Sequence, residues 1–121
     1  MSESQFKAEV RKDFSLRYRG RGVLWTNDTG YAESHHDPFG GPGAGDLIGL
    51  LCGRWIEIET KTLIGKARSL QLIRRKLVRD RGGIYIEART LEQIHAVLDE
   101  IDQPNGAMRE ELGNGLQRVS K

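Results

Sequence analysis

Hydrophobic and polar positions follow two different periods along the chain, and these periods predict its helices and strands. Apolar residues spaced three to four apart, typical of amphipathic helices, mark segments 3–18, 70–81 and 91–101. Short apolar or alternating runs, typical of β-strands, mark segments 23–25, 46–51, 55–61 and 84–88. The resulting order, αβββαβα, predicts a mixed α/β domain in which helices flank a small β-sheet.

Two of the predicted strands are separated only by the short turn sequence Cys52-Gly53-Arg54, which predicts an antiparallel hairpin. The second of them alternates, so its apolar and polar side chains are expected on opposite faces. One face carries Ile56, Ile58 and Thr60, and the other carries Trp55, Glu57, Glu59 and Lys61.

Each predicted helix has an apolar stripe that is expected to face the sheet. In the first helix the inward residues are Phe6, Val10 and Phe14. In the second they are Leu70, Ile73, Leu77 and Val78, and in the third Leu91, Ile94, Val97, Leu98 and Ile101.

Length and composition fit one folded unit. The 121 residues suit a single domain over 1–102, followed by a polar segment, 103–121, that has room for one short helix. No apolar run approaches the length of a membrane span, and no secretory signal pattern is visible. The single cysteine, Cys52, excludes an internal disulfide and fits a reducing compartment, so we expect a cytoplasmic protein without a membrane segment.

The net charge is only +2, but basic residues gather in and before the second predicted helix. Such a cluster fits a polyanionic partner, although composition alone favours solvated helix faces as the explanation. If the partner is DNA, the residues expected to contact phosphates are Lys66, Arg68, Arg74, Arg75 and Arg79.

The predicted hairpin gathers charged residues at one rim of the sheet. Asp46 begins one strand and Glu59 and Lys61 end the other, so antiparallel pairing makes them neighbours. Two adjacent carboxylates repel each other unless a cation lies between them, and Mg²⁺ prefers carboxylate oxygens and water as ligands. A salt bridge at an exposed hairpin end is the simpler explanation of Glu-x-Lys alone. The Gly-rich segment before Asp46 and the basic helix after Lys61 favour a phosphodiester-hydrolysing site.

Several short motifs together resemble one nuclease family. They are Asn27-Asp28-Thr29-Gly30, the "GAGDLIG" of 43–49, Glu59-Thr60-Lys61, Ser69-Leu70-Gln71 and Gly82-Gly83. Their combination resembles the virus-type replication-repair nuclease (VRR-NUC) domain of the PD-(D/E)xK superfamily, over most of the chain. The resemblance implies a restriction-endonuclease-like core. The chain departs from the family pattern at Gly45, where a proline is common, and in the spacing of Ser69 and Gln71.

By this resemblance, Asp46, Glu59 and the carbonyl of Thr60 would bind Mg²⁺ or Mn²⁺, with Lys61 acting on the nucleophile or transition state. Gln71 would support the site from its helix. A further acidic ligand is expected from the first helix, where both Glu3 and Glu9 are available. Glu3 falls within the predicted inward stripe and Glu9 about 100° from its centre, so we choose Glu3, with Glu9 as the alternative.

The resemblance predicts a metal-dependent DNA endonuclease that acts as a homodimer on branched DNA such as Holliday junctions. Two rivals remain open. One is a non-catalytic nucleic-acid-binding module that keeps the nuclease fold, and the other is an interaction subunit of a phage or DNA repair complex.

Overall fold

The computed structural model describes residues 1–27, 44–61 and 69–102. The predicted polar segment 103–121 and the basic residues Lys66 and Arg68 lie outside these ranges. The described elements follow the predicted order: α1 (Glu3–Arg17), β1 (Gly22–Thr26), β2 (Leu47–Leu51), β3 (Arg54–Thr60), α2 (Ser69–Asp80), β4 (Ile84–Ala88) and α3 (Leu91–Ile101). Within the described ranges, no helix has the length and apolar character needed to cross a membrane.

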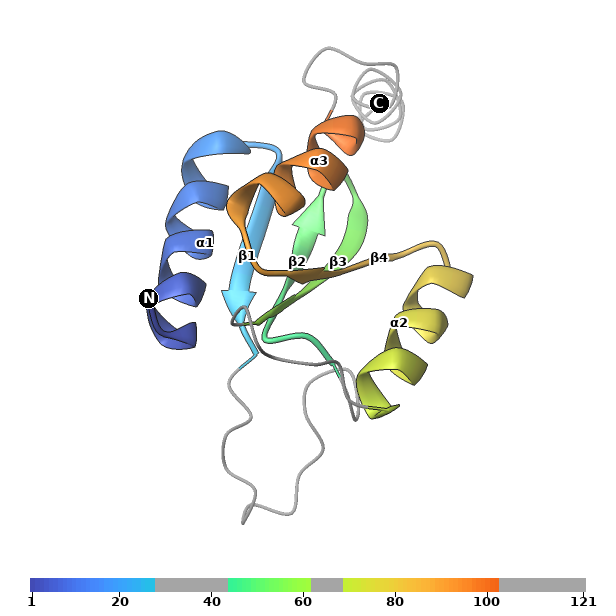
Figure 1. The fold of residues 1–121 in the computed structure, drawn as a ribbon. Helices are drawn as coiled ribbons and strands as arrows, with labels where there is room; N and C mark the ends of the chain where they lie inside the picture. The colour runs from blue at the N-terminus through green and yellow to red at the C-terminus, as the bar shows by residue number, and fades with distance from the viewer. Residues whose placement is uncertain (28–43, 62–68, 103–121) are drawn as a thin grey trace, which may run out of the picture.

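The four strands form one mixed sheet in the order β1-β2-β3-β4 (Figure 1). Strand β2 pairs antiparallel with both β1 and β3, whereas β3 and β4 are parallel and are connected through α2. This is a small α/β fold with a mixed sheet flanked by helices, as the periodicity predicted. The carboxyl ends of β3 and β4 therefore lie side by side, next to the beginning of β2.

A two-residue turn sets the register of the β2–β3 hairpin. Leu51 pairs with Arg54, so the turn consists of Cys52 and Gly53. Both turn residues have positive φ angles, 51° and 81°, as a turn that matches the twist of its strands requires. Further along the hairpin Leu47 pairs with Ile58, which places Asp46 beside the end of β3.

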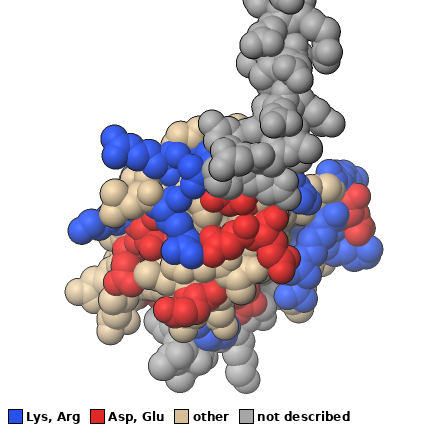
Figure 2. Space-filling model, turned by 90° about the horizontal axis from the view of Figure 1, so that it is seen from above, with Lys and Arg blue, Asp and Glu red and all other residues tan. Residues whose placement is uncertain are grey.

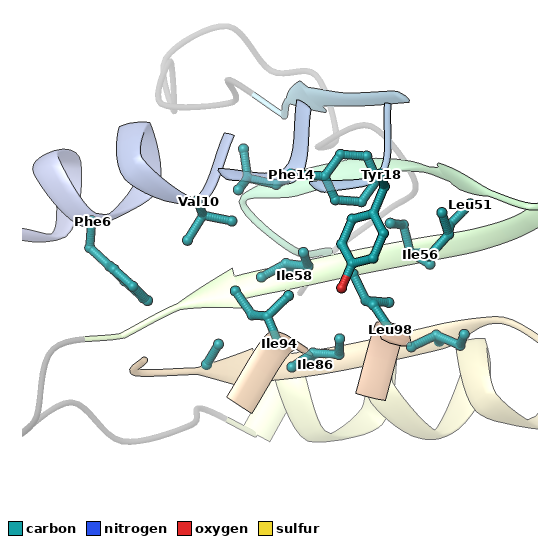
Figure 3. Packing of buried hydrophobic residues seen from close by; sticks show 13 residues of the cluster. Phe6, Val10, Phe14, Tyr18, Leu51, Ile56, Ile58, Ile86, Ile94 and Leu98 are labelled. Atoms are coloured by element: carbon teal, nitrogen blue, oxygen red, sulfur yellow. The ribbon is translucent and has the colours of Figure 1, made fainter. Parts of the chain in front are cut away.

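The hydrophobic core lies between one face of the sheet and the two helices α1 and α3. The predicted inward face of β3 contributes Ile56 and Ile58, both completely buried. Figure 3 shows these side chains facing those of both helices, such as Phe14 of α1 and Leu98 of α3. Phe6, Val10 and Ile94 are buried in the same cluster, as their helical spacing predicted.

Polar contacts join the exposed rims of α1 and α3. The Asp13 carboxylate lies 2.6 Å from His95 Nε2. One turn further along, the Asp99 carboxylate accepts hydrogen bonds from Arg17 Nη2 at 2.6 Å and from the Tyr18 hydroxyl at 2.7 Å. The two helices are thus tied to each other as well as to the sheet face that they cover.

Helix α2 covers the other side of β3 and β4, and its orientation corrects our prediction. Of the four residues expected to face the sheet, only Val78 is buried. Leu70, Ile73 and Leu77 are 57%, 63% and 39% exposed. The reason is the polarity of the strand face beneath, which carries Glu57 and Glu59 and is met by polar side chains of α2. On α3, Val97 is likewise 37% exposed rather than inward.

Candidate functional site

The hairpin brings Asp46 against the end of β3. Its Oδ2 atom accepts hydrogen bonds from the Thr60 backbone N–H at 3.0 Å and from Thr60 Oγ1 at 2.9 Å. The neighbouring positions of Asp46 and Glu59 follow from the register, so this predicted pair is brought together as expected.

Glu59 is a buried carboxyl group in a crowded electrostatic setting. It is 7% exposed and accepts a hydrogen bond from Gln71 Nε2 at 2.6 Å. Burial, and then the negative charge of Asp46, raise the pKa of Glu59 to about 7, against the opposing effect of Lys61. Near neutral pH its charge is therefore sensitive to any cation that approaches.

Lys61 extends from the end of β3 toward Glu59. Its Nζ atom lies 3.4 Å from Glu59 Oε2, and its side chain is 10% exposed. Its backbone N–H donates to the Ala88 carbonyl at 2.9 Å, which anchors this end of β3 to β4. The ammonium group therefore lies next to the carboxylate pair, on the face shared by Glu57 and Glu59.

Glu57 lies one pleat behind Glu59 and is completely buried. Its carboxylate pairs with Arg74 of α2, with Nη2 at 2.5 Å and Nε at 3.1 Å. It also accepts hydrogen bonds from Trp55 Nε1 at 2.7 Å and from the Gly45 backbone N–H at 3.1 Å. Glu57 is thus in an ion pair, in keeping with the polar face of the strand that carries it.

Strand β4 adds residues that sequence reasoning missed. The parallel register places Tyr85 beside Glu57, and Glu87 beside Glu59. Burial, and then the negative charges of the surrounding carboxylates, led by Glu59, raise the pKa of Tyr85 above its usual value. Glu87 pairs with Arg89 at 3.1 Å. The alternation of "IYIEA" indicates that Tyr85 and Glu87 share a face, but not which strand they adjoin.

The residues predicted to contact DNA differ in how far they are exposed to solvent. Arg74 is 11% exposed on its side chain and faces Glu57, so it does not project toward solvent. Arg75 and Arg79, together with Arg89, line an open hollow of about 630 Å³ between α2 and α3 along β4. Figure 2 shows basic side chains gathered on the α2 side of the molecule, beside acidic side chains over α3. Lys66 and Arg68 lie outside the described residues.

The predicted acid from α1 does not join this cluster in the structure. Glu3 and Glu9 are both exposed, and among the described residues no hydrogen bond or ion pair links either to Asp46 or Glu59. The inward stripe of α1 packs on the opposite face of the sheet from Gln71 and α2. The choice between Glu3 and Glu9 as a ligand stays a prediction.

The donor set fits a hard divalent cation. No group of three or more acidic, histidine or cysteine side chains that could hold a metal occurs in the part of the chain that the structure describes. Mg²⁺, however, commonly uses only one or two carboxylates and completes its shell with water. Burial and the negative charge of Asp46, which together raise the pKa of Glu59, both disfavour its carboxylate form, and a cation between Asp46 and Glu59 would offset both effects.

No protein-family model, curated protein or solved structure gives a significant match to the chain. Its function is therefore inferred from the geometry of the site and from the motif resemblance.

Proposed function

We propose that the protein is a Mg²⁺- or Mn²⁺-dependent DNA endonuclease with the restriction-endonuclease-like core of the VRR-NUC domains. The observation that carries the proposal is the meeting of Asp46, Glu59 and Lys61 at the ends of neighbouring strands. Pure nucleic-acid binding needs no pair of adjacent carboxylates, and repulsion from phosphates would oppose it. A partly buried carboxylate pair beside an ammonium group suits hydrolysis of a phosphodiester bond.

In this proposal Asp46, Glu59 and the Thr60 carbonyl would hold the cation, which would supply polarisation of the phosphate and a lower pKa for a bound water. Lys61 donates to a phosphate oxygen and stabilises the negative charge that develops there. Gln71 donates to Glu59 Oε2 and so restricts the rotation of that carboxyl group. Most of these residues are held by a strand or helix rather than by a loop, which favours fixed geometry.

The substrate is DNA, and we propose branched DNA, including four-way junctions, from the family resemblance. Support for a polyanion comes from Arg75 and Arg79, which line the hollow between α2 and α3. Gln71, Arg75 and Arg79 recur every four residues on α2, so they follow one side of the helix away from the carboxylate pair. A phosphate backbone that reached Glu59 would pass these guanidinium groups.

We further propose that the enzyme is a homodimer that uses the outward face of α2. This face presents Leu70, Ile73 and Leu77 to solvent and is bordered by Lys76 and Asp80, which form an ion pair at 2.8 Å. A two-fold axis across the helix near Ile73 would bury the apolar stripes of the two copies against each other. Such self-complementarity is what an isologous contact requires.

The homodimer is tested by sedimentation velocity of the wild type and of Ile73→Glu. The wild type is expected to sediment as a dimer and the variant as a folded monomer, because a carboxylate would be buried in the contact. Ser15→Glu on α1 is a matched control, since Ser15 is exposed on the opposite side of the sheet. A wild type that remains monomeric at micromolar concentration would remove this part of the proposal.

The main test is incubation of the protein with labelled four-way junction, flap and linear DNA, in Mg²⁺, Mn²⁺ or EDTA. The wild type is expected to cut in either metal and not in EDTA. Lys61→Ala is expected to bind DNA but lose cleavage, with Lys61→Met as a variant that preserves side-chain length. Cleavage that survives both substitutions would overturn the assignment, and binding without cutting on every substrate would favour a non-catalytic module.

A further inference from the structure

The buried carboxylate of Glu57 connects three separate parts of the chain. Its partners are the Gly45 backbone N–H ahead of β2, Trp55 Nε1 at the start of β3, and the Nε and Nη2 donors of the Arg74 guanidinium on α2. Glu57 has no exposed surface, and Arg74 has a side chain that is 11% exposed. The link is therefore a desolvated, bidentate ion pair with two further donors.

Two of these partners lie next to residues of the proposed metal site. Gly45 precedes Asp46, and its carbonyl accepts a hydrogen bond from Asn27 Nδ2 at 3.0 Å. Arg74 follows Gln71 by three residues on α2, and Gln71 donates to Glu59. Glu57 thus holds the backbone beside Asp46 and the helical turn that carries Gln71.

The backbone at Gly45 packs closely against Ile58 of β3. A Cβ atom at Gly45 would lie 2.9 Å from the Ile58 carbonyl oxygen and 3.0 Å from the Ile58 nitrogen. The backbone at Gly45 therefore lies directly on β3, where glycine fits and a larger residue would force it away. The hydrogen bond from the Gly45 N–H to Glu57 keeps the backbone at Gly45 close to β3. It does so although the neighbouring carboxylates of Asp46 and Glu59 repel each other.

We propose that the Glu57–Arg74 ion pair positions Asp46 and Gln71 for metal binding. This inference rests on the proposed nuclease function. Arg74 neutralises Glu57, so Glu57 can orient its neighbours without adding a third uncompensated negative charge to the site. Groups that orient metal ligands in this way commonly change metal affinity about 10- to 100-fold when they are replaced.

The test variant is Glu57→Gln, which keeps the size of the side chain but presents an amide nitrogen to donors. Two readouts separate positioning from general stability. In the absence of metal, hydrogen exchange at the Thr60 amide reports the position of Asp46, because this N–H donates to Asp46 Oδ2. Titration with Mn²⁺ alone, followed by calorimetry, reports the affinity of the site without any need for catalysis.

In Glu57→Gln we expect the Thr60 amide hydrogen to exchange faster than in the wild type. We also expect this variant to bind Mn²⁺ about 10- to 100-fold more weakly. Arg74→Lys keeps the charge but not the bidentate geometry. Its Thr60 exchange rate and its Mn²⁺ affinity are therefore expected to lie between those of the wild type and those of Glu57→Gln. Asp99→Asn is the matched control, since it removes an ion pair between α1 and α3 on the other face of the sheet. It is expected to leave the Mn²⁺ affinity unchanged and to speed Thr60 exchange by no more than its loss of global stability accounts for.

Should Glu57→Gln fail to fold, the double variant Glu57→Gln with Arg74→Gln avoids the unpaired buried guanidinium and takes its place. A folded variant with wild-type Thr60 exchange and wild-type Mn²⁺ affinity overturns the inference. In that event, loss of Mn²⁺ binding in Asp46→Asn would show that Asp46 still binds the metal as proposed. A wild type that neither binds Mn²⁺ nor cuts DNA overturns the proposed function. In that case faster Thr60 exchange in Glu57→Gln would still support the positioning of Asp46.

Discussion

The contact of Asp99 with α1 offers a test of the fold that does not depend on function. Asp99 of α3 accepts hydrogen bonds from Arg17 and from the hydroxyl of the buried Tyr18, and these contacts lower its pKa from 3.8 to about 2. The chief cause is the hydrogen bond from Arg17, opposed by partial burial and helped by Tyr18. Asp99→Asn removes the charge while it keeps an oxygen that can accept the Tyr18 hydroxyl.

The size of the effect follows from the pKa. The lowering of the Asp99 pKa corresponds to at most about 2.5 kcal/mol of folding free energy if it is taken at face value. The Asp99 side chain is 44% exposed, however, so solvent screening reduces the expected contribution to about 1 kcal/mol. Because the folded pKa lies below the unfolded one, this contribution is present above about pH 4 and is lost as the pH falls through about 2.

Urea unfolding followed by circular dichroism, for wild type and Asp99→Asn between pH 2 and pH 7, measures this difference directly. We expect the variant to be less stable by about 1 kcal/mol at pH 6, and the two curves to converge between about pH 4 and pH 2. A difference that stays constant across this range would refute the electrostatic explanation. Equal stability at pH 6 would show that the α1–α3 contact contributes nothing measurable.

Three further outcomes are expected. Gly49→Ala should destabilise the fold by about 2 kcal/mol or more in urea unfolding, because its Cβ would lie 2.0 Å from the Val23 carbonyl oxygen; unchanged stability would contradict the tight β1–β2 packing. Ile94→Ala, in the core, should lower the free energy of unfolding by about 2–5 kcal/mol, and a loss below about 1 kcal/mol would argue against its burial. Replacing Arg75 and Arg79 together by glutamine should weaken DNA binding and reduce the slope of log affinity against log salt concentration by about 2, measured by fluorescence anisotropy; an unchanged slope would exclude both from phosphate contact.

The strands and the hairpin are well predicted from the sequence because each rests on local patterns. Alternation in β3 separates Ile56 and Ile58 from Glu57 and Glu59, and the short turn requires antiparallel pairing. Together these local patterns are enough to predict that Asp46 lies beside Glu59. The roles of these residues in metal binding and catalysis remain proposals that rest on geometry and resemblance.

The orientation of α2 could not be predicted in the same way. Periodicity finds an apolar stripe, but it does not say whether that stripe faces the sheet or the solvent. Here the underlying strand face is polar, so Arg74 turns inward to meet Glu57 and Ile73 turns outward. Tyr85 was missed for a related reason, since its place in the site depends on the parallel pairing of β4 with β3, which is a long-range contact.

The Cys52–Gly53 turn has a consequence for how the chain tolerates insertions and deletions. Because side chains alternate along a strand, a slip of one residue in β3 would exchange its two faces. Glu57 and Glu59 would then enter the apolar layer under α1 and α3, and Ile58 would replace them beside Asp46. We therefore expect length changes of a single residue in this turn to disrupt folding and any chemistry at the site together, whereas substitutions of exposed residues on α3 would spare both. The pairing of β3 with β2 thus makes this two-residue turn a place where the length of the chain is strongly constrained.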